Sequence, residues 1–324
     1  MKIIVTGASG YIGSRLCLHL SSKGHEITAI CRSKIPQKEG WTELIDNFIV
    51  GDIRKMKTIN LIADVNADVI IHLVSLDHHA SEKEPDFVLD VNVKPTWNLL
   101  EAHADKNLKK FIYFSTIHVY GKNQSGLILE NKKVSPFNAY GLTHALSEEI
   151  CNYYNLKTEI DCINVRLSNS YGEPVFYNAK CWDLIVNDLT KSAYFDKKIV
   201  LKGDGESIRD FIHFKDVCKG IESLIGESTN FGDENTFHFS SSKSLTMLDV
   251  AIKVKDIYRK RYNTEIPIFI NSNKEWDSEK RIQIGDNSIS NILAKKQNID
   301  FAKDLKEGIN DIFNYLEIEK PLKI

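Results

Sequence analysis

The chain has 324 residues, a length that suits one large domain or two modest ones. Its net charge of −2 gives no sign of a nucleic-acid or anionic-membrane partner, and neither is predicted. No apolar run approaches the ~18 residues of a membrane span, and a strand predicted from Ile3 leaves no room for a signal peptide. The six cysteines form no Cys-x-x-Cys pair, so we expect reduced, buried thiols in a cytoplasmic protein.

Strand-like and helix-like runs alternate through the first half of the chain. The predicted elements are a strand at Lys2–Thr6, a helix at Ile12–Ser22, strands at Ile27–Ile30, Phe48–Val50 and Val69–Leu73, a long helix at Asp86–Ala104, a strand at Phe111–Ser115, a helix at Tyr140–Tyr154 and a strand at Ile160–Arg166. Such alternation implies right-handed βαβ units, and therefore an α/β fold with a Rossmann-type, doubly wound parallel sheet. We assign residues 1–168 to this dinucleotide-binding domain, whose sheet can take a further strand from later in the chain.

The second half of the chain has shorter strands and is punctuated by glycines. Two helices are predicted there, at Leu245–Tyr258, capped by Ser244 or Thr246, and at Leu305–Leu316. We expect residues 169–324 to form mainly a smaller substrate-binding region.

Three glycines, Gly7, Gly10 and Gly13, join the first strand to the first helix. A turn without side chains places free backbone N–H groups where a pyrophosphate can sit against the helix N-terminus. The alternative is an ordinary tight βα turn. The position between a strand and a helix favours dinucleotide binding.

Two hydroxyl groups are expected at the same edge of the sheet. Thr116 follows a buried strand, and Tyr140 lies at the start of the next predicted helix. Ligands of a doubly wound sheet lie beyond the carboxyl ends of its strands, so the two side chains can meet over a nicotinamide ring. This arrangement suits hydride transfer, in which the phenol exchanges a proton with the substrate oxygen.

Eight motifs follow one another in a specific order and spacing. They are Gly7-x-x-Gly10-x-x-Gly13, Gly51-Asp52-Ile53, His72-Leu73-Val74-Ser75, Asn92, Ser115-Thr116-x-x-Val119-Tyr120-Gly121, Tyr140-x-x-x-His144, Arg166-x-x-Asn169-x-Tyr171-Gly172 and Arg209-Asp210-Phe211-Ile212-His213-x-x-Asp216-Val217. With them the chain resembles the extended short-chain dehydrogenase/reductase family, in its sugar-nucleotide epimerase and dehydratase group. The resemblance covers essentially the whole chain.

The resemblance implies roles for individual residues. Thr116 takes the hydroxyl position that bonds the substrate, Tyr140 the acid/base position, and His144 the position of the family's catalytic lysine. The implied cofactor-binding residues are Gly7, Gly10, Tyr11, Ile12, Gly13, Cys31, Arg32, Asp52, Ile53, Leu73, Val74, Ser75, Asn92, Tyr140 and His144. The implied substrate-binding residues are Thr116, His118, Asn169, Arg209 and Arg281, where arginine suits the nucleotide diphosphate because its planar fork binds phosphate oxygens bidentately.

His144 departs from the family motif Tyr-x-x-x-Lys. The lysine lowers the pKa of the tyrosine and donates to the nicotinamide ribose. An unperturbed imidazole still donates to the ribose, but it is mostly neutral at pH 7. We therefore expect His144 to orient the cofactor and to make activity more pH-dependent. The alternative is that His144 only packs on the helix.

The end of the second strand also departs from the family. NAD-specific members carry an acidic residue where this chain has Cys31, and Arg32 follows it. No carboxylate repels a 2′-phosphate there, and Arg32 can pair with one. The cofactor is therefore NAD or NADP, with a slight preference for NADP. The alternative is a solvated basic turn.

The residues after Thr116 bear on the reaction. Dehydratases resemble one another in having acidic residues where this chain has Ile117 and His118. Dehydration is therefore disfavoured, which leaves a C4 dehydrogenase or 4-keto reductase acting on a nucleotide sugar, or a 4-epimerase. A dinucleotide-binding sensor with weakened catalysis is the alternative of another class.

Three further expectations concern metals, the core and assembly. The adjacent His78 and His79 point to different sides and lack a carboxylate or cysteine constellation, so no metal site is predicted and a loop near the active site is favoured. Trp97 and Leu100 are predicted as core. By resemblance, a homodimer forms through a four-helix bundle of Asp86–Ala104 and Tyr140–Tyr154.

Overall fold

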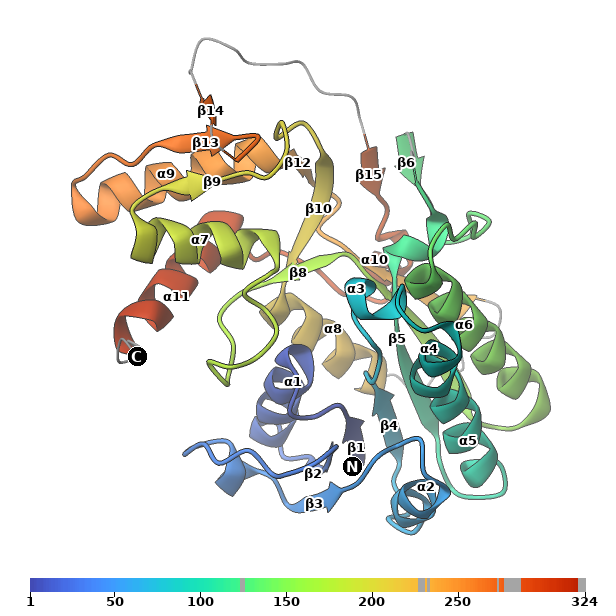
Figure 1. Ribbon diagram of the computed structural model, residues 1–324. Coiled ribbons are helices and arrows are strands. Elements are labelled where there is room, and N and C mark those ends of the chain that lie inside the picture. Colours follow the sequence, from blue (N-terminus) through green and yellow to red (C-terminus); the bar gives the residue numbers. More distant parts are fainter. Residues whose placement is uncertain (123–125, 227–230, 232–233, 273, 277–286, 320–324) are drawn as a thin grey trace.

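A seven-stranded parallel sheet forms the centre of the computed structural model, which describes residues 1–122, 126–226, 231, 234–272, 274–276 and 287–319 (Figure 1). Its strand order is β11-β7-β5-β4-β1-β2-β3, and each neighbouring pair is parallel. The strands are β1 (Lys2–Thr6), β2 (Glu26–Cys31), β3 (Asn47–Val50), β4 (Val69–His72), β5 (Lys110–Thr116), β7 (Asp161–Leu167) and β11 (Thr236–Phe239). The predicted Rossmann-type, doubly wound sheet is confirmed.

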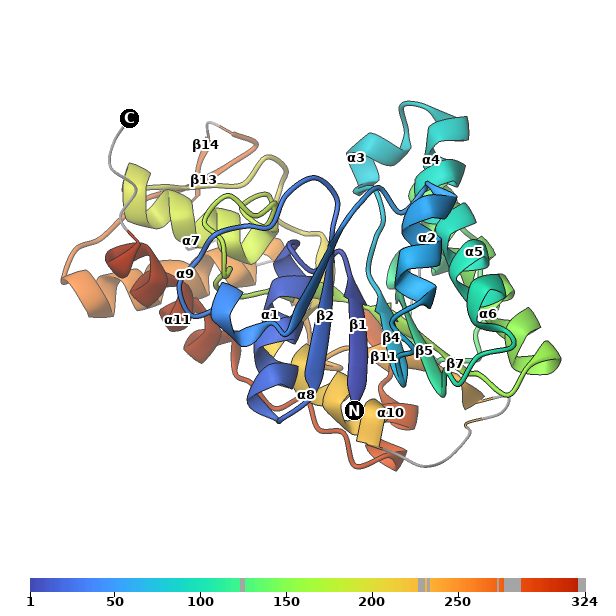
Figure 2. The same ribbon diagram turned by 90° about the horizontal axis from the view of Figure 1, so that it is seen from below.

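Helices cover both faces of the sheet, as Figure 2 shows edge-on. Successive strand residues point to opposite faces, so Ile3 packs in one cluster with Leu16 and Ile221, and Ile4 in another with Leu99. The first face carries α1 (Tyr11–Ser22) and α8 (Phe214–Gly226). The second carries α2 (Met56–Ala63), α4 (Pro85–Asn92), α5 (Lys94–His103) and α6 (Ala139–Lys157).

The single long helix predicted at Asp86–Ala104 is wrong. The structure has two helices there, α4 and α5, which meet at Val93. Pro95 is the cause, because its nitrogen has no hydrogen to donate to the preceding turn and its ring disfavours helical geometry just before it. Pro95 is instead accommodated in the first turn of α5, where a missing N–H costs nothing.

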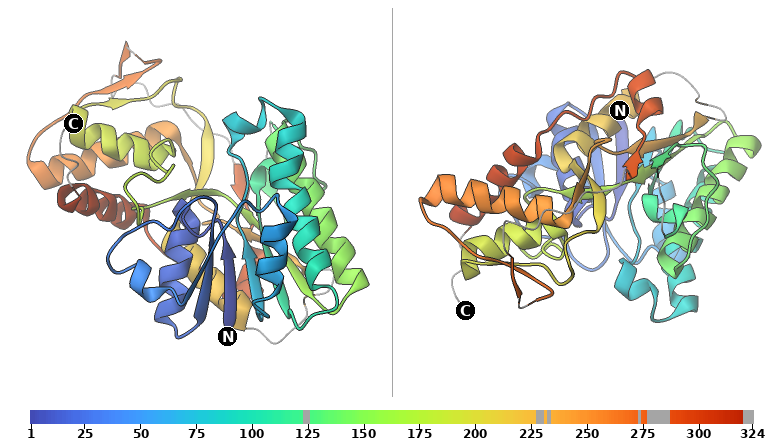
Figure 3. Two further views of the ribbon diagram at one scale, coloured as in Figure 1. Left: turned by 60° about the horizontal axis from the view of Figure 1, so that its bottom comes forward. Right: turned by 90° about the horizontal axis from the view of Figure 1, so that it is seen from above.

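The C-terminal part of the chain builds a second core beyond the carboxyl edge of the sheet (Figure 3). Its helices are α7 (Ile185–Asp196), α9 (Met247–Tyr262) and α11 (Leu305–Ile318). Thr246, one of the two predicted caps, starts α9 in a capping box with Asp249. Two small sheets join them: β12 (Ser244–Thr246), β10 (Ile208–His213) and β8 (Asn169–Tyr171), and then β14 (Lys274–Glu275), β13 (Ile268–Ile270) and β9 (Ile199–Val200).

Short elements complete the described chain. They are η1 (Thr42–Leu44), α3 (His78–Ser81), η2 (Ile117–Tyr120), β6 (Gly126–Ile128), β15 (Asn287–Ile289) and α10 (Ile292–Lys296). β11, α8 and α10 follow residue 168 in the chain but pack with the central sheet. All six cysteines are buried and free, as predicted. Among the described residues, no helix has the length and apolarity needed to span a membrane.

Candidate active site

The glycine turn closes tightly at the end of β1. Gly7 has a φ of +68°, which favours glycine, and the Gly10 N–H donates to the Gly7 carbonyl at 2.9 Å. A Cβ on Gly13 would lie 2.3 Å from that carbonyl oxygen, so only glycine fits there. The first N–H groups of α1 have no acceptor within the helix. The cradle therefore fits the pyrophosphate of a dinucleotide.

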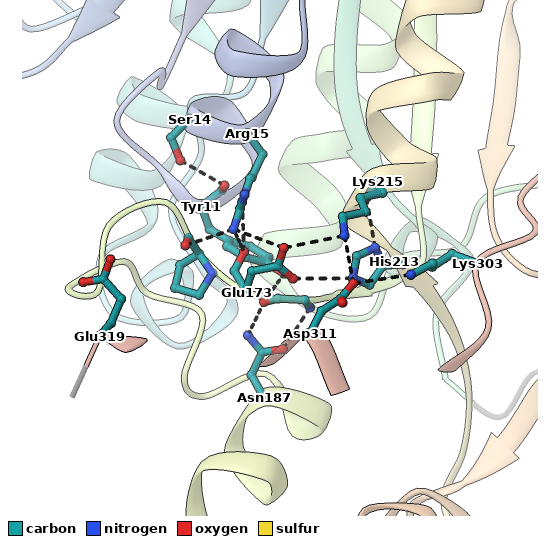
Figure 4. Close-up of polar contacts among 12 residues, drawn as sticks. Tyr11, Ser14, Arg15, Glu173, Asn187, His213, Lys215, Lys303, Asp311 and Glu319 are labelled. Carbon is teal, nitrogen blue, oxygen red and sulfur yellow. Dashed lines mark hydrogen bonds and ion pairs between the residues drawn. The ribbon is translucent and has the colours of Figure 1, made fainter. Parts of the chain in front are cut away.

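Tyr11 connects this turn to the C-terminal region. Its hydroxyl donates to the Gly172 carbonyl at 2.9 Å, and Arg15 Nη2 donates to the Glu173 carbonyl at 2.6 Å (Figure 4). The side chain of Tyr11 is thus committed to a contact 161 residues away. Only its backbone, with that of Ile12, remains for a phosphate.

The ends of β2 and β3 carry the residues predicted to lie beside the adenosine of the cofactor. The Cys31 thiol is 1% exposed, and burial raises its pKa, whereas the Arg32 side chain is exposed. Asp52 receives hydrogen bonds from the Arg54 guanidinium at 3.0 Å, which lower its pKa to about 2. Ile53 beside it is buried. This edge therefore offers an arginine-paired carboxylate, Asp52, and an exposed arginine, Arg32.

The segment after β4 runs along the glycine turn. The Leu73 N–H donates to Thr6 Oγ1 at 3.1 Å, and Val74 lies within 3.5 Å of the position that a Cβ on Gly7 would take. Ser75 is exposed. The predicted cofactor residues Leu73, Val74 and Ser75 are thus brought beside the phosphate cradle.

Asn92 holds that segment in place. Its Oδ1 accepts from the Leu76 N–H at 2.8 Å, and its Nδ2 donates to Thr143 Oγ1 at 2.9 Å. Its side chain is fully buried, because α4 and α6 enclose it. Both ends of the amide are occupied, so its contacts support a positioning role for Asn92.

Tyr140 lies in the first turn of α6, beside the end of β5. Asn138 caps this helix, because its Oδ1 accepts from the Gly141 N–H at 2.8 Å. Burial raises the pKa of Tyr140, a side-chain hydrogen bond with Thr116 opposes this, and the charge of Asp77 adds to the rise. Within the described chain no cationic side chain contributes to lowering that pKa. Tyr140 therefore rests as a neutral phenol.

His144 is packed one turn later on α6, with its ring centroid 4.6 Å from that of Tyr140. Its Nδ1 lies 2.8 Å from the Tyr113 hydroxyl, and its buried Nε2 has no hydrogen-bond partner among the residues that the structure describes. Burial lowers the pKa of His144 to about 3, so the ring stays neutral far below pH 7. This contradicts the expectation that titration of His144 makes activity more pH-dependent. The unpartnered Nε2 fits a bond to a ribose hydroxyl.

Two further histidines approach Tyr140. The ring of His118, on η2, lies 5.7 Å from the Tyr140 ring, and that of His78, on α3, lies 6.4 Å from it. Asn138 Nδ2 lies 3.3 Å from His78 Nε2. The sequence placed His78 in a loop near the site but gave it no role, because only the fold brings α3 onto the start of α6. Asp77 caps α3 and pairs with Lys180 at 3.3 Å.

The predicted diphosphate residues lie on β8 and β10, which pair in parallel. Asn169 Nδ2 donates to the Asp210 carbonyl at 2.9 Å. Arg209 is exposed, and its Nη1 donates to the Ile208 carbonyl at 2.8 Å. Arg281 lies outside the described residues. Arg209 thus has an exposed guanidinium whose one hydrogen bond, within the described part of the chain, goes to a neighbouring backbone carbonyl.

A buried ion pair that sequence reasoning missed supports the end of β5. Arg166 donates to Glu148 at 2.9 and 2.6 Å and to the Tyr120 hydroxyl at 2.6 Å. Ser115, the neighbour of Thr116, also donates to Glu148. The available signal was an arginine inside a predicted strand of the central sheet, since a charge buried there requires a partner.

Glu173, His213 and Asp311 place possible ligand atoms within 4.8 Å of one another, in the joint drawn in Figure 4. The Lys215 N–H donates to His213 Nδ1 at 3.2 Å, so the ring hydrogen is on Nε2, which faces Glu173 at 3.8 Å. Arg15 lies 3.4 Å from Glu173, and the Lys215 ammonium 2.8 Å from Asp311. The arrangement favours an ionic joint over a cation site.

A cavity of about 690 Å³ opens beside this joint, between α1, α8 and residues 302–307. None of its lining residues is Thr116, Tyr140 or His144. It therefore belongs to the far side of α1 and not to the chemistry at the strand ends.

Comparison with known proteins identifies the class. A family model described as "NAD dependent epimerase/dehydratase family" matches residues 3–237, more than half of the chain. The chain therefore belongs to this family and is an enzyme of it, which confirms the resemblance read from its motifs.

Individual relatives match over nearly the full length. The Bacillus subtilis protein described as "Uncharacterized UDP-glucose epimerase YtcB" is 27% identical over 98% of both chains. The Thermotoga maritima UDP-glucose 4-epimerase solved with UDP-glucose is 20% identical, with a TM-score of 0.84 over 99% of this chain and 100% of that one. The Bacillus cereus UDP-glucuronic acid 4-epimerase solved with UDP-glucuronic acid and NAD is 24% identical, with a TM-score of 0.79 over 98% and 99%. The two structures share the fold of this chain.

Proposed function

We propose that the protein transfers a hydride to or from C4 of a nucleotide-activated sugar, as a 4-keto reductase or 4-dehydrogenase with Tyr140 as acid/base. The observation that carries this proposal is the Thr116–Tyr140 pair at the carboxyl end of β5, with Tyr140 a neutral phenol. A phenol is the form that donates a proton to a carbonyl oxygen as hydride arrives at C4. This favours the reducing direction.

The cradle and its surroundings support a nicotinamide dinucleotide as cofactor. Gly7, Gly10 and Gly13 would hold its pyrophosphate, Asp52 its adenosine and His144 Nε2 its nicotinamide ribose. When bound, the cofactor supplies or accepts the hydride. The chain itself positions the C4 oxygen with Thr116 and moves the proton through Tyr140.

The test is single-turnover reduction of dTDP-4-keto-6-deoxyglucose by the reduced nicotinamide cofactor. The reaction is followed as the loss of absorbance of the reduced cofactor. We expect turnover by the wild type and loss of at least ~100-fold in Tyr140→Phe, which keeps the ring but has no proton to donate. Equal rates in the two proteins would refute the assignment of Tyr140.

A 4-epimerase is the second candidate, favoured by the 27% identity to a protein described as a UDP-glucose epimerase. A 4-epimerase uses the same residues to oxidise C4 and then to reduce it, so the oxidation state of the cofactor is unchanged at the end. Chromatography of UDP-glucose incubated with the protein and NAD separates the cases: UDP-galactose as product indicates the epimerase. Tight dinucleotide binding with no turnover of any nucleotide sugar would instead indicate the sensor.

We further propose a preference for NADP over NAD. The support is the absence of a carboxylate at Cys31 and the exposed guanidinium of Arg32, which can pair with a 2′-phosphate. Arg32→Ala should weaken NADP binding by ~10-fold and leave NAD binding within ~2-fold, measured by titration calorimetry. Equal losses for both dinucleotides would exclude Arg32 as a phosphate ligand.

A homodimer through α4, α5 and α6 is also proposed. Exposed apolar side chains gather on these helices: Phe87, Leu89, Trp97, Leu142, Leu146 and Tyr153, each 36–48% exposed. Trp97 was predicted as core, but only Leu100 is, because Trp97 turns outward and stacks on Tyr153 at 6.0 Å. Burial of such a patch between two copies removes apolar surface from water.

The solution mass tests the dimer. Leu146→Lys should lower the solution mass to that of a monomer. Leu44→Lys, at an exposed leucine outside the patch, should leave the mass that of a dimer. A monomeric wild type would refute the proposal. We also propose a cytoplasmic location, and a division into a dinucleotide-binding domain at residues 1–168 and a mainly substrate-binding region at residues 169–324.

A further inference from the structure

His118 is an imidazole beside Tyr140 that the hydride transfer leaves unused. Its ring stands at 75° to the Tyr140 ring, 5.7 Å away, and its backbone N–H donates to Thr116 Oγ1 at 3.2 Å. Its ring nitrogens make no hydrogen bond to any residue that the structure describes. The ring is thus held next to the reacting oxygen with both nitrogens free to meet a ligand.

The surroundings of His118 keep it unprotonated. Burial lowers its pKa, and the neighbouring His78 and Arg209 lower it further. No carboxylate contributes to the opposite shift among the described residues. A neutral imidazole with a free lone pair is a base, and a base beside a ketone has a specific use.

We propose that His118 removes and returns a proton at a carbon adjacent to C4 of the bound sugar. This inference rests on the proposed oxidation state change at C4, because only the 4-keto sugar has acidic C–H bonds beside its carbonyl. The enzyme then exchanges the hydrogen at that carbon with solvent, which is the step needed to invert a second stereocentre.

The step balances without a further reactant. The C–H bond breaks, its proton moves to the free nitrogen of His118, and the electron pair moves through the carbonyl to the C4 oxygen. The hydroxyls of Thr116 and Tyr140 hydrogen-bond the resulting enolate oxygen. Return of a proton from the imidazolium to carbon restores the ketone, and solvent exchange of that proton in between replaces the original hydrogen.

Ile117 explains why the enolate is reprotonated and does not eliminate. Loss of a hydroxyl from the neighbouring carbon requires an acid to protonate it as it leaves. Ile117 has no proton to give and packs on the small apolar cluster around Val119 and Tyr120. His118 therefore acts without the acid partner that dehydration needs.

The experiment uses the full-length protein in D₂O with two probes. UDP-glucose with NAD, and in parallel with NADP, reports oxidation through the absorbance of reduced nicotinamide, and deuterium in the recovered sugar reports exchange. dTDP-4-keto-6-deoxyglucose with either oxidised cofactor is already a ketone, so deuterium uptake into it requires only the base. We expect the wild type to add one deuterium to this second probe, located next to C4 by NMR.

Three variants assign the base. His118→Gln and His118→Ala should lose exchange by at least ~100-fold, and free imidazole should restore it to His118→Ala. His79→Gln, at an exposed histidine of α3, is the matched control and should exchange like the wild type. Undiminished exchange in His118→Gln would overturn the proposal, as would loss without imidazole rescue in His118→Ala.

The two probes separate this inference from the function on which it rests. Oxidation or epimerisation of UDP-glucose with no deuterium in either sugar would overturn the role of His118 and leave C4 chemistry intact. Exchange into the keto probe without any hydride transfer would support His118 and refute the proposed oxidoreductase. No exchange and no hydride transfer would refute both.

Discussion

His144→Lys restores a cation to the one position where this chain departs most from its family. The ring centroids of Tyr140 and His144 lie 4.6 Å apart, and both side chains are on the same side of α6. A charge ~5–6 Å from the phenol oxygen, at an effective dielectric constant of ~20, is worth about 3 kcal/mol, or ~2 pKa units. Burial of the ammonium reduces this. We therefore expect the pKa of Tyr140 to fall by ~1–2 units.

The sign of the effect depends on the direction of the reaction. Oxidation at C4 needs the phenolate, so its rate rises with pH until the pKa of Tyr140 is reached. In His144→Lys this rise should move ~1–2 pH units lower and oxidation at pH 7 should increase about tenfold or more. The assay measures kcat/KM for nucleotide-sugar oxidation from about pH 6 to about pH 10 in the wild type and in His144→Lys.

His144→Gln is the matched control, because it keeps a hydrogen-bonding side chain and adds no charge. Its pH profile should coincide with that of the wild type. Thermal unfolding of both variants checks that the buried site tolerates them. If His144→Lys is folded and its pH profile is unmoved, the charge at this position does not set the pKa of Tyr140 and the reasoning fails.

Three further predictions follow from the buried groups of the fold. Glu148→Gln leaves its arginine partner buried without a counter-charge and should cost about 3–5 kcal/mol in urea unfolding, whereas Lys296→Gln, in an exposed pair, should change stability by less than ~0.5 kcal/mol. Gly13→Ala places a Cβ 2.3 Å from a backbone oxygen and should abolish dinucleotide binding in a fluorescence titration, and Gly203→Ala, with open space around it, should not. Burial holds the pKa of His72 at about 3 in the folded protein, below its ~6.5 when unfolded, so the unfolded state binds the extra proton below pH 6.5. The free energy of unfolding should therefore fall as the pH is lowered from ~6.5 towards 3, and His72→Phe should flatten that slope; a slope equal to the wild type would contradict it.

Local chemistry explains the features that the sequence predicted correctly. The glycine turn needs only three residues without side chains between a strand and a helix, and the apolar runs at β1, β4 and β5 can be read as buried parallel strands. The start of α9 is likewise local, because Thr246 and Asp249 bond each other's backbone. The undivided helix predicted at Asp86–Ala104 is wrong, because Pro95 interrupts a stretch whose periodicity alone favours one helix.

The chemical state of the site is set by contacts between distant parts of the chain. The sequence alone determined that Tyr140 and Thr116 share an edge with a dinucleotide turn, because strand ends and helix starts follow from pattern. Only the tertiary structure decided that His144 stays neutral far below pH 7, since Tyr113 and the surrounding core enclose it. It also decided that His118 lies beside the phenol with ring nitrogens that bond no residue in the described part of the chain. The desolvation of a side chain depends on which elements pack around it, and these elements come from segments that are distant in the sequence.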